Sequence, residues 1–402
     1  MPETLLDVPE GQPPAVAPPV VLGDSVVRYG ACSWADRSLV RDGEFYPKKT
    51  MTASARLAYY TSQLPLAEIA TTYRFPPTPE LAAQWAERTQ NGFCFDVRAW
   101  SLLTDSPTLP DSLWEDLQRE VRPESRHRRR LYAAHLPDEV VDECWARFAH
   151  ALGPLQSQGR LGVVVLQYPS WWSPSPDHRL ALAAARERLS DFRVAVELRS
   201  RKWLEGGECE ATLELLEDHD LSFVCTDGPA AGPRALPEVV AATAEVAVVR
   251  FHGRRQDPDD PWTWPYRYRD AELAEWVPRV TELAASAREV HLLFDNGWRA
   301  DAVDNARALA RLLGGVRPDR AGSVTGAGVG GAAHDRPVVA HHPPRPAHGV
   351  ADEHVDGGDR GPSLGAEQVL VHRHPGDVAD DFDAFLGEDE LELGRALEER
   401  EE

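Results

Sequence analysis

Eight short stretches of the chain carry apolar residues with period two, and most of them are followed by a segment with helical spacing. In the stretch 192–200, the side chains of Ala195, Glu197 and Arg199 share one face. The stretch begins apolar on both faces, which is typical of a parallel strand covered on both sides. The same patterns predict strands at 26–33, 66–73, 92–100, 161–169, 192–200, 221–228, 245–254 and 289–297.

Helices are predicted between most of these strands, at 53–63, 79–88, 138–152, 177–189, 209–219, 271–287 and 300–313. Alternating strands and helices indicate a parallel sheet, and eight such units over this length favour a (β/α)8 TIM barrel at residues 25–316. A doubly wound sheet is the alternative fold. Residues 1–24 are rich in proline and are expected to be a flexible lead-in.

The last part of the chain, 317–402, has no periodicity that would bury a face, and we expect it to be a disordered acidic tail with at most a short helix at 382–399. The whole chain of 402 residues has a formal net charge of −22. This charge argues against a general nucleic-acid binder, which needs clustered Lys and Arg. The partner that we expect is a small-molecule substrate, and the oligomeric state is left open.

The five cysteines form no CxxC pair, which suits a reducing cytoplasm. No stretch reaches 18 consecutive apolar residues, so we expect no membrane span and a cytoplasmic location.

Polar residues gather near the C-terminal ends of seven predicted strands, where a TIM barrel places its site. Residues two apart on one strand share a face, so we predict that these side chains converge on one pocket. They are Glu68, Thr72, Asp96, Arg98, Gln167, Glu197, Arg199, Asp227, Arg250, His252, Asp295 and Asn296. Tryptophans follow the same strand ends at 34, 100, 171, 172, 203, 262, 264 and 298, and indoles of this kind stack on sugars or bases.

Several motifs occur in an order that resembles the DUF72 (YecE-like) family: GACSW, FYP, RLAYYTSQLPLAEIATTYRFPP, GFCFDVRAW, VAVELRSRKW, VVRFHGR and LFDNG. The resemblance spans about residues 26–315. It implies a TIM barrel and implies no reaction. Arg98 stands where the family usually has Lys, and because Arg stays protonated it cannot act as a base.

Three functions remain open. The preferred one is an acid–base hydrolase or lyase that acts on a polar, anionic, sugar- or nucleotide-like substrate. Its catalytic residues would be Glu197, Glu68, Asp227 and His252, with one carboxylic acid of a pair kept protonated by burial. Its substrate-binding residues would be Arg98, Arg199, Arg250, Asp96, Gln167, Asp295, Asn296, Trp34 and Trp203.

The second function is a metal-dependent phosphodiesterase or isomerase, with Glu68, Glu197, Asp227, His252 and Asp295 as ligands for Mg²⁺, Mn²⁺ or Zn²⁺. His291 begins its strand and is expected at the opposite end of the barrel. The third is a non-catalytic anion-binding barrel. No cofactor is required by the sequence, and a divalent metal is left open.

Overall fold

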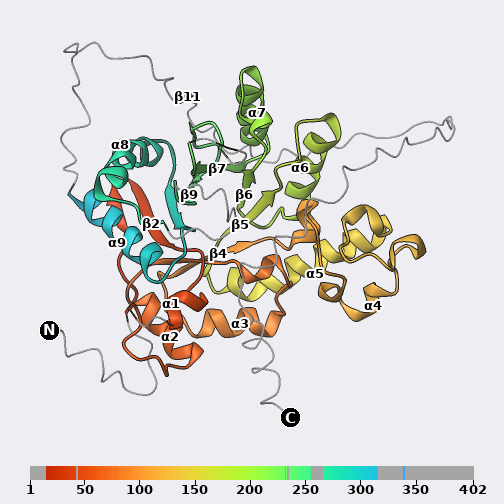
Figure 1. The fold of residues 1–402 in the computed structure, drawn as a ribbon, viewed down its shortest axis with the longest axis horizontal. Helices are drawn as coiled ribbons and strands as arrows, with labels where there is room; N and C mark the ends of the chain where they lie inside the picture. Colours follow the sequence, from red (N-terminus) through yellow and green to blue (C-terminus); the bar gives the residue numbers. More distant parts are fainter. Residues whose placement is uncertain are drawn as a thin grey trace, which may run out of the picture.

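A computed structural model describes residues 15–41, 44–230, 232, 235–254 and 266–315, together with the backbone of 338–339. Eight parallel strands close into a barrel, because β2 pairs with both β10 and β3. Helices surround these strands (Figure 1). The predicted TIM barrel is therefore confirmed. Around the barrel the strands are β2 (Ser25–Ala31), β3 (Leu66–Ile69), β4 (Cys94–Arg98), β5 (Leu161–Tyr168), β6 (Val194–Leu198), β7 (Leu221–Asp227), β9 (Val246–Phe251) and β10 (Glu289–Phe294).

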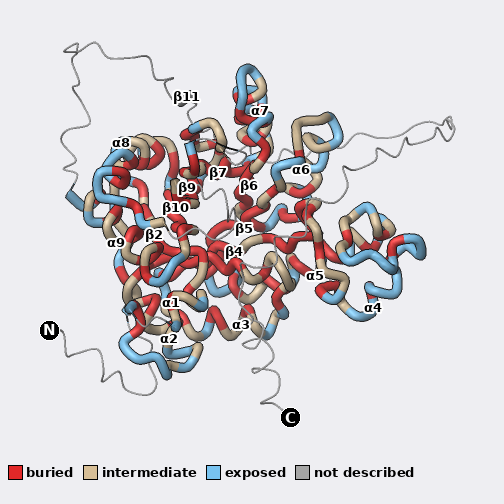
Figure 2. Tube along the Cα trace, viewed as in Figure 1, coloured by how far each residue is buried: buried red, intermediate tan, exposed pale blue. Residues whose placement is uncertain are grey.

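Two hydrophobic clusters explain why the strands are apolar on both faces. The smaller cluster fills the barrel interior with strand side chains, among them Val163, Ala195 and Val248. The larger cluster joins the opposite faces of the strands to the helices. Figure 2 shows the strands as the buried centre of the molecule, with exposed residues along the outer sides of the helices. Each side chain on a strand thus points either into the barrel or toward the helices.

The long helices lie close to their predicted bounds: α2 (Ala53–Thr61), α3 (Pro79–Glu87), α5 (Asp138–Ser157), α6 (Pro176–Arg188), α7 (Gly207–Asp218), α8 (Asp270–Ser286) and α9 (Asp301–Gly314). Local chemistry sets several of their starts. The hydroxyl of Thr78 accepts a hydrogen bond from the Leu81 amide at 3.2 Å, and Pro79 occupies the first helical position. The short helices α1 (Arg37–Arg41) and α4 (Glu115–Gln118) lie in loops that the periodicity did not predict as helical.

Residues 15–24, expected within the flexible lead-in, are partly ordered by the barrel. Strand β1 (Val20–Leu22) pairs antiparallel with β2, and the Ala17 amide donates to the carbonyl of Thr61 at 2.8 Å. Residues 1–14 lie outside the described part. So does the tail 317–402, apart from β11 (Val338–Val339), which pairs with β8 (Val239–Val240). Within the described ranges, no helix has the length and apolar character needed to cross a bilayer.

A polar site at the C-terminal end of the barrel

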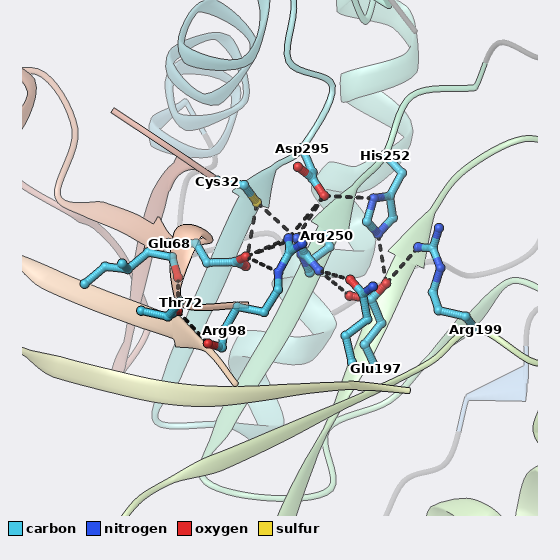
Figure 3. A network of polar contacts seen from close by, with 11 residues as sticks. Cys32, Glu68, Thr72, Arg98, Glu197, Arg199, Arg250, His252 and Asp295 are labelled. Atoms are coloured by element: carbon cyan, nitrogen blue, oxygen red, sulfur yellow. Dashed lines mark hydrogen bonds and ion pairs between the residues drawn. The ribbon is translucent and has the colours of Figure 1, made fainter. Parts of the chain in front are cut away.

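Arg250, near the end of β9, lies at the centre of a charged network inside the barrel (Figure 3). Its side chain is completely buried. The Nη1 group donates to Glu197 Oε2 at 2.5 Å and to Gln167 Oε1 at 2.9 Å. The Nη2 group donates to Asp295 Oδ2 at 2.8 Å and to Glu68 Oε1 at 3.2 Å. One guanidinium therefore ties together the ends of β3, β5, β6 and β10.

Two further arginines flank this centre and are less buried. Arg98 Nε donates to Glu68 Oε1 at 2.8 Å, and 12% of its side chain is exposed. Arg199 Nη1 donates to Glu197 Oε1 at 2.7 Å, and 25% of its side chain is exposed. Figure 3 shows Arg98 and Arg199 on opposite sides of Arg250. Because Glu68 and Glu197 are fully buried, the network runs from a dry interior to a partly hydrated rim.

His252 lies at this rim, between two carboxylates. Its Nε2 atom is 3.1 Å from Glu197 Oε1, and its Nδ1 atom is 3.3 Å from Asp295 Oδ2. About 14% of the His252 side chain and 26% of the Asp295 side chain are exposed. An imidazole whose two nitrogens both face carboxylates is held in orientation, because either ring nitrogen can donate its hydrogen to an oxygen.

Cys32, directly after β2, also belongs to this site, although it is not among the site residues predicted from the sequence. Arg250 Nη2 lies 3.4 Å from the Cys32 sulfur, and the thiol donates to Glu68 Oε2 at 3.7 Å. Burial and the carboxylates of Asp295 and Glu68 raise the pKa of the Cys32 thiol well above its ordinary value. The thiol is therefore neutral, and its position after a strand was the one signal that could have placed it in the site.

Neighbouring cations decide the ionisation of the carboxylates at this site. Burial acts to raise the pKa of Glu197, but Arg250, His252 and Arg199 together hold that pKa well below its ordinary value. For Asp295, burial is likewise outweighed by Arg250, His252 and Arg98, and the pKa is lowered. Glu197 is therefore ionised at neutral pH and fits the ionised member of the predicted carboxylate pair, whereas the protonated member stays a prediction.

Four of the five predicted metal ligands come together at this site, and the fifth, Asp227, lies elsewhere. Glu68, Glu197 and Asp295 converge, but on the guanidinium of Arg250, which occupies the position between them. The three carboxylates thus already share a permanent cation.

Asp96 shares the interior face with Arg98, as predicted, but lies deeper in the barrel. Its carboxylate contacts His291 Nδ1 at 2.9 Å and accepts the Val163 amide at 2.9 Å. Asp96 lies two residues before Arg98 on the strand, which corresponds to about 6.6 Å further from the rim. This position does not support the prediction that Asp96 binds substrate. Thr72, expected further up the β3 face, lies in a 3₁₀ turn and donates to the carbonyls of Ile69 and Arg98.

Asp227 and Asn296 were predicted in the pocket and point toward the helices instead. Asp227 accepts from the Trp276 indole at 2.6 Å and from the Tyr268 hydroxyl at 2.7 Å, and it also pairs with Arg254. Asn296 donates to Asn305 Oδ1 at 3.0 Å. The residue two positions before each of them belongs to the larger hydrophobic cluster, which lies between the strands and the helices. Because residues two apart on a strand share a face, both side chains point out of the barrel.

The tryptophans after the strands mostly pack. Trp34 lies against Trp85 and Phe95, and Trp203 stacks on Trp172 with its indole N–H bonded to the Trp172 carbonyl at 2.7 Å. Their predicted role in substrate binding is therefore not supported. Trp171 and Trp298 stay 45% and 44% exposed. Trp262 and Trp264 lie outside the described residues.

The fold and the site define a TIM barrel whose C-terminal end carries a network of arginines, carboxylates and one histidine. The chain belongs to the family described as "Protein of unknown function DUF72", whose model matches residues 28–324. The resemblance seen in the sequence motifs is thus confirmed.

Known relatives agree with this assignment. The chain is 26% identical over 299 residues to the UPF0759 protein YunF of Bacillus subtilis. The aligned region covers 72% of this chain and 95% of YunF. A DUF72 family crystal structure from Enterococcus faecalis superposes with a TM-score of 0.58 at 23% identity, covering 71% of this chain and 95% of the other. A DUF72 family structure from Thermotoga maritima superposes with a TM-score of 0.55 at 24% identity, covering 71% of this chain and 98% of the other. These structures support the fold.

Proposed function

We propose that this protein is an acid–base enzyme, a hydrolase or lyase, that acts on a small polar anion such as a sugar phosphate or nucleotide at the C-terminal end of the barrel. The observation that carries the proposal is the position of His252. Its imidazole is held between Glu197 and Asp295 at the rim, beside a partly exposed arginine that shares the same oxygen of Glu197.

Arg199 is the group best placed to bind the anion. Only its Nη1 has a hydrogen-bond partner among the described residues, which leaves the other N–H groups of a planar fork for a phosphate or carboxylate. Its exposed fraction is the largest of the three arginines at the site. Arg98 supplies a second positive charge across the centre.

His252 is the proposed proton carrier. The carboxylates of Glu197 and Asp295 hold the imidazole at the rim, where it can exchange a proton with a substrate that enters there. Arg250 and Glu68 are positioning residues, because both are completely buried: Arg250 binds the carboxylates of Glu197 and Asp295 that hold His252, and Glu68 binds Arg250. The roles assigned to Glu68 and Arg250 therefore change from direct to indirect.

The test is a binding and turnover screen of the full-length protein with inorganic phosphate, sugar phosphates and nucleoside monophosphates. Binding is measured by calorimetry, and products are identified by ³¹P NMR and mass spectrometry. Losing one charge-assisted hydrogen bond costs about 1.5–3 kcal/mol, so Arg199→Gln should weaken binding of an active compound about 10- to 100-fold. His252→Gln should leave binding within a few-fold and reduce turnover about 10²- to 10⁴-fold.

Arg201→Gln is the matched control. Arg201 lies two residues further along, is 57% exposed and has its own ion pair with Glu205, so its loss should not change binding or turnover. Tight binding without any product would refute the catalytic role and support an anion-binding barrel. A turnover that survives His252→Gln unchanged would overturn the assignment of the proton carrier.

A further inference from the structure

A second group of polar side chains lies deep in the barrel, away from the Arg250 network. It consists of Cys94 and Asp96 on β4 and His291 on β10. One ligand-type atom from each, the sulfur, a carboxylate oxygen and a ring nitrogen, lies within 4.8 Å of the others, and all three residues are buried. In sequence, Asp96 and His291 are 195 positions apart, so only the closure of the barrel brings them together.

The chemistry of this group is that of a transition-metal site. Thiolate, imidazole and carboxylate are the three ligand types that Zn²⁺ takes in proteins, and the soft sulfur selects against Mg²⁺ and Ca²⁺. We propose that Cys94, Asp96 and His291 bind a divalent transition-metal ion of the zinc type. This site is separate from the proposed catalytic rim and does not depend on it.

The surrounding contacts match those of a metal site. The other nitrogen of His291, Nε2, lies 3.4 Å from Glu289 Oε2. Glu289 is in turn held by Arg28 and Arg193, each at 3.1 Å. Metal-bound histidines usually donate their second N–H to a carboxylate, which fixes the ring and raises its basicity. The opposite ring nitrogen, Nδ1, is the one that faces Asp96 and is thus the expected ligand atom.

Gly162, at the start of β5, makes room for the cluster. A Cβ atom at this position would lie 2.2 Å from Asp96 Oδ1, 2.6 Å from the Cys94 sulfur and 3.0 Å from His291 Cε1. The β5 backbone therefore lies directly against all three proposed ligands. The adjacent Val163 amide donates to Asp96 Oδ1 at 2.9 Å and so orients the carboxylate.

Binding requires a small adjustment. With bond lengths of 2.0–2.3 Å, ligand atoms around tetrahedral zinc lie roughly 3.3–3.8 Å apart. The Asp96 and His291 atoms are now 2.9 Å apart, at hydrogen-bonding distance, so the metal would replace a proton between them and spread the pair by about half an ångström. The Glu289 side chain is 25% exposed and marks the end of the barrel from which an ion would enter.

The experiment is a titration of the full-length, chelator-treated protein with Zn²⁺ by calorimetry and with Co²⁺ by absorption. We expect one ion per chain at this site and a near-ultraviolet charge-transfer band from a cobalt–thiolate bond. Cys94→Ser should remove the band. Glu289→Gln keeps all three ligands, and it should weaken Zn²⁺ binding about 10- to 100-fold.

Cys225→Ser and Cys32→Ser are the controls. Cys225 is buried on the outer face of β7, and Cys32 lies in the Arg250 network, so the band should survive both substitutions. Binding of ions to the seven histidines of residues 318–375 would produce no thiolate band, and it would be unchanged in the His291→Gln variant. The proposal is overturned if no band appears, if Cys32→Ser removes it, or if folded His291→Gln and Glu289→Gln variants bind with unchanged affinity.

Discussion

Replacing Arg250 by methionine tests whether the charged network supports the barrel as well as the site. The substitution removes a completely buried guanidinium and leaves Glu68 and Glu197 in the interior. Removing one partner of a buried ion pair typically costs about 3–5 kcal/mol. Each carboxylate keeps one arginine, Arg98 for Glu68 and Arg199 for Glu197, so we expect the lower end of this range.

The assay is thermal and urea unfolding of the wild type and the variant. A loss of about 3 kcal/mol should lower the Tm by about 5 °C, because the unfolding entropy of a domain this large is about 0.6 kcal/mol/K. Arg267→Met is the matched control, because Arg267 also makes two ion pairs, with Asp301 at 2.7 Å and Asp304 at 3.0 Å, but is 59% exposed. Exposed pairs contribute about 0–1 kcal/mol, so its Tm should fall by less than about 2 °C.

A double-mutant cycle with Glu197→Gln separates the ion pair from general packing. If Arg250 and Glu197 act through each other, the double variant should lose about 1–3 kcal/mol less than the sum of the single losses. Equal losses for Arg250→Met and Arg267→Met, or additive losses in the cycle, would refute the reasoning that burial makes this network strong.

Two further expectations follow from the same geometry. The folded-state pKa values of Glu197 and Asp295 are lowered, so the unfolded chain binds more protons than the folded chain as the pH falls below about 4.5, and the protein should lose stability there. Urea unfolding midpoints measured between about pH 3.5 and 6 should fall less steeply with pH for Glu197→Gln than for the wild type. Asp227→Asn should lower the Tm, since it weakens the bonds from Tyr268 and the pair with Arg254, yet leave anion binding unchanged; an altered affinity would return Asp227 to the pocket.

The sequence by itself determined the barrel and the composition of much of its site. Period-two apolar stretches separated by helical segments indicate βα units, because each pattern allows only one way to bury its apolar face. On β6, the spacing of Glu197 and Arg199 placed both on one face, and the structure has them paired at 2.7 Å. The residues that Arg250 joins through oxygen atoms (Glu68, Gln167, Glu197 and Asp295) were all among the site residues predicted from the sequence, whereas Cys32 was not.

Only the tertiary structure decided which face of each strand points inward. The strand 221–227 is apolar on both faces, so nothing local tells whether Thr226 or Asp227 enters the barrel. The structure also decided depth: Asp96 and Arg98 share a face, but Asp96 meets His291 rather than the rim. Such pairings depend on the register of strands far apart in the chain, which the closure of the barrel fixes and no local pattern encodes.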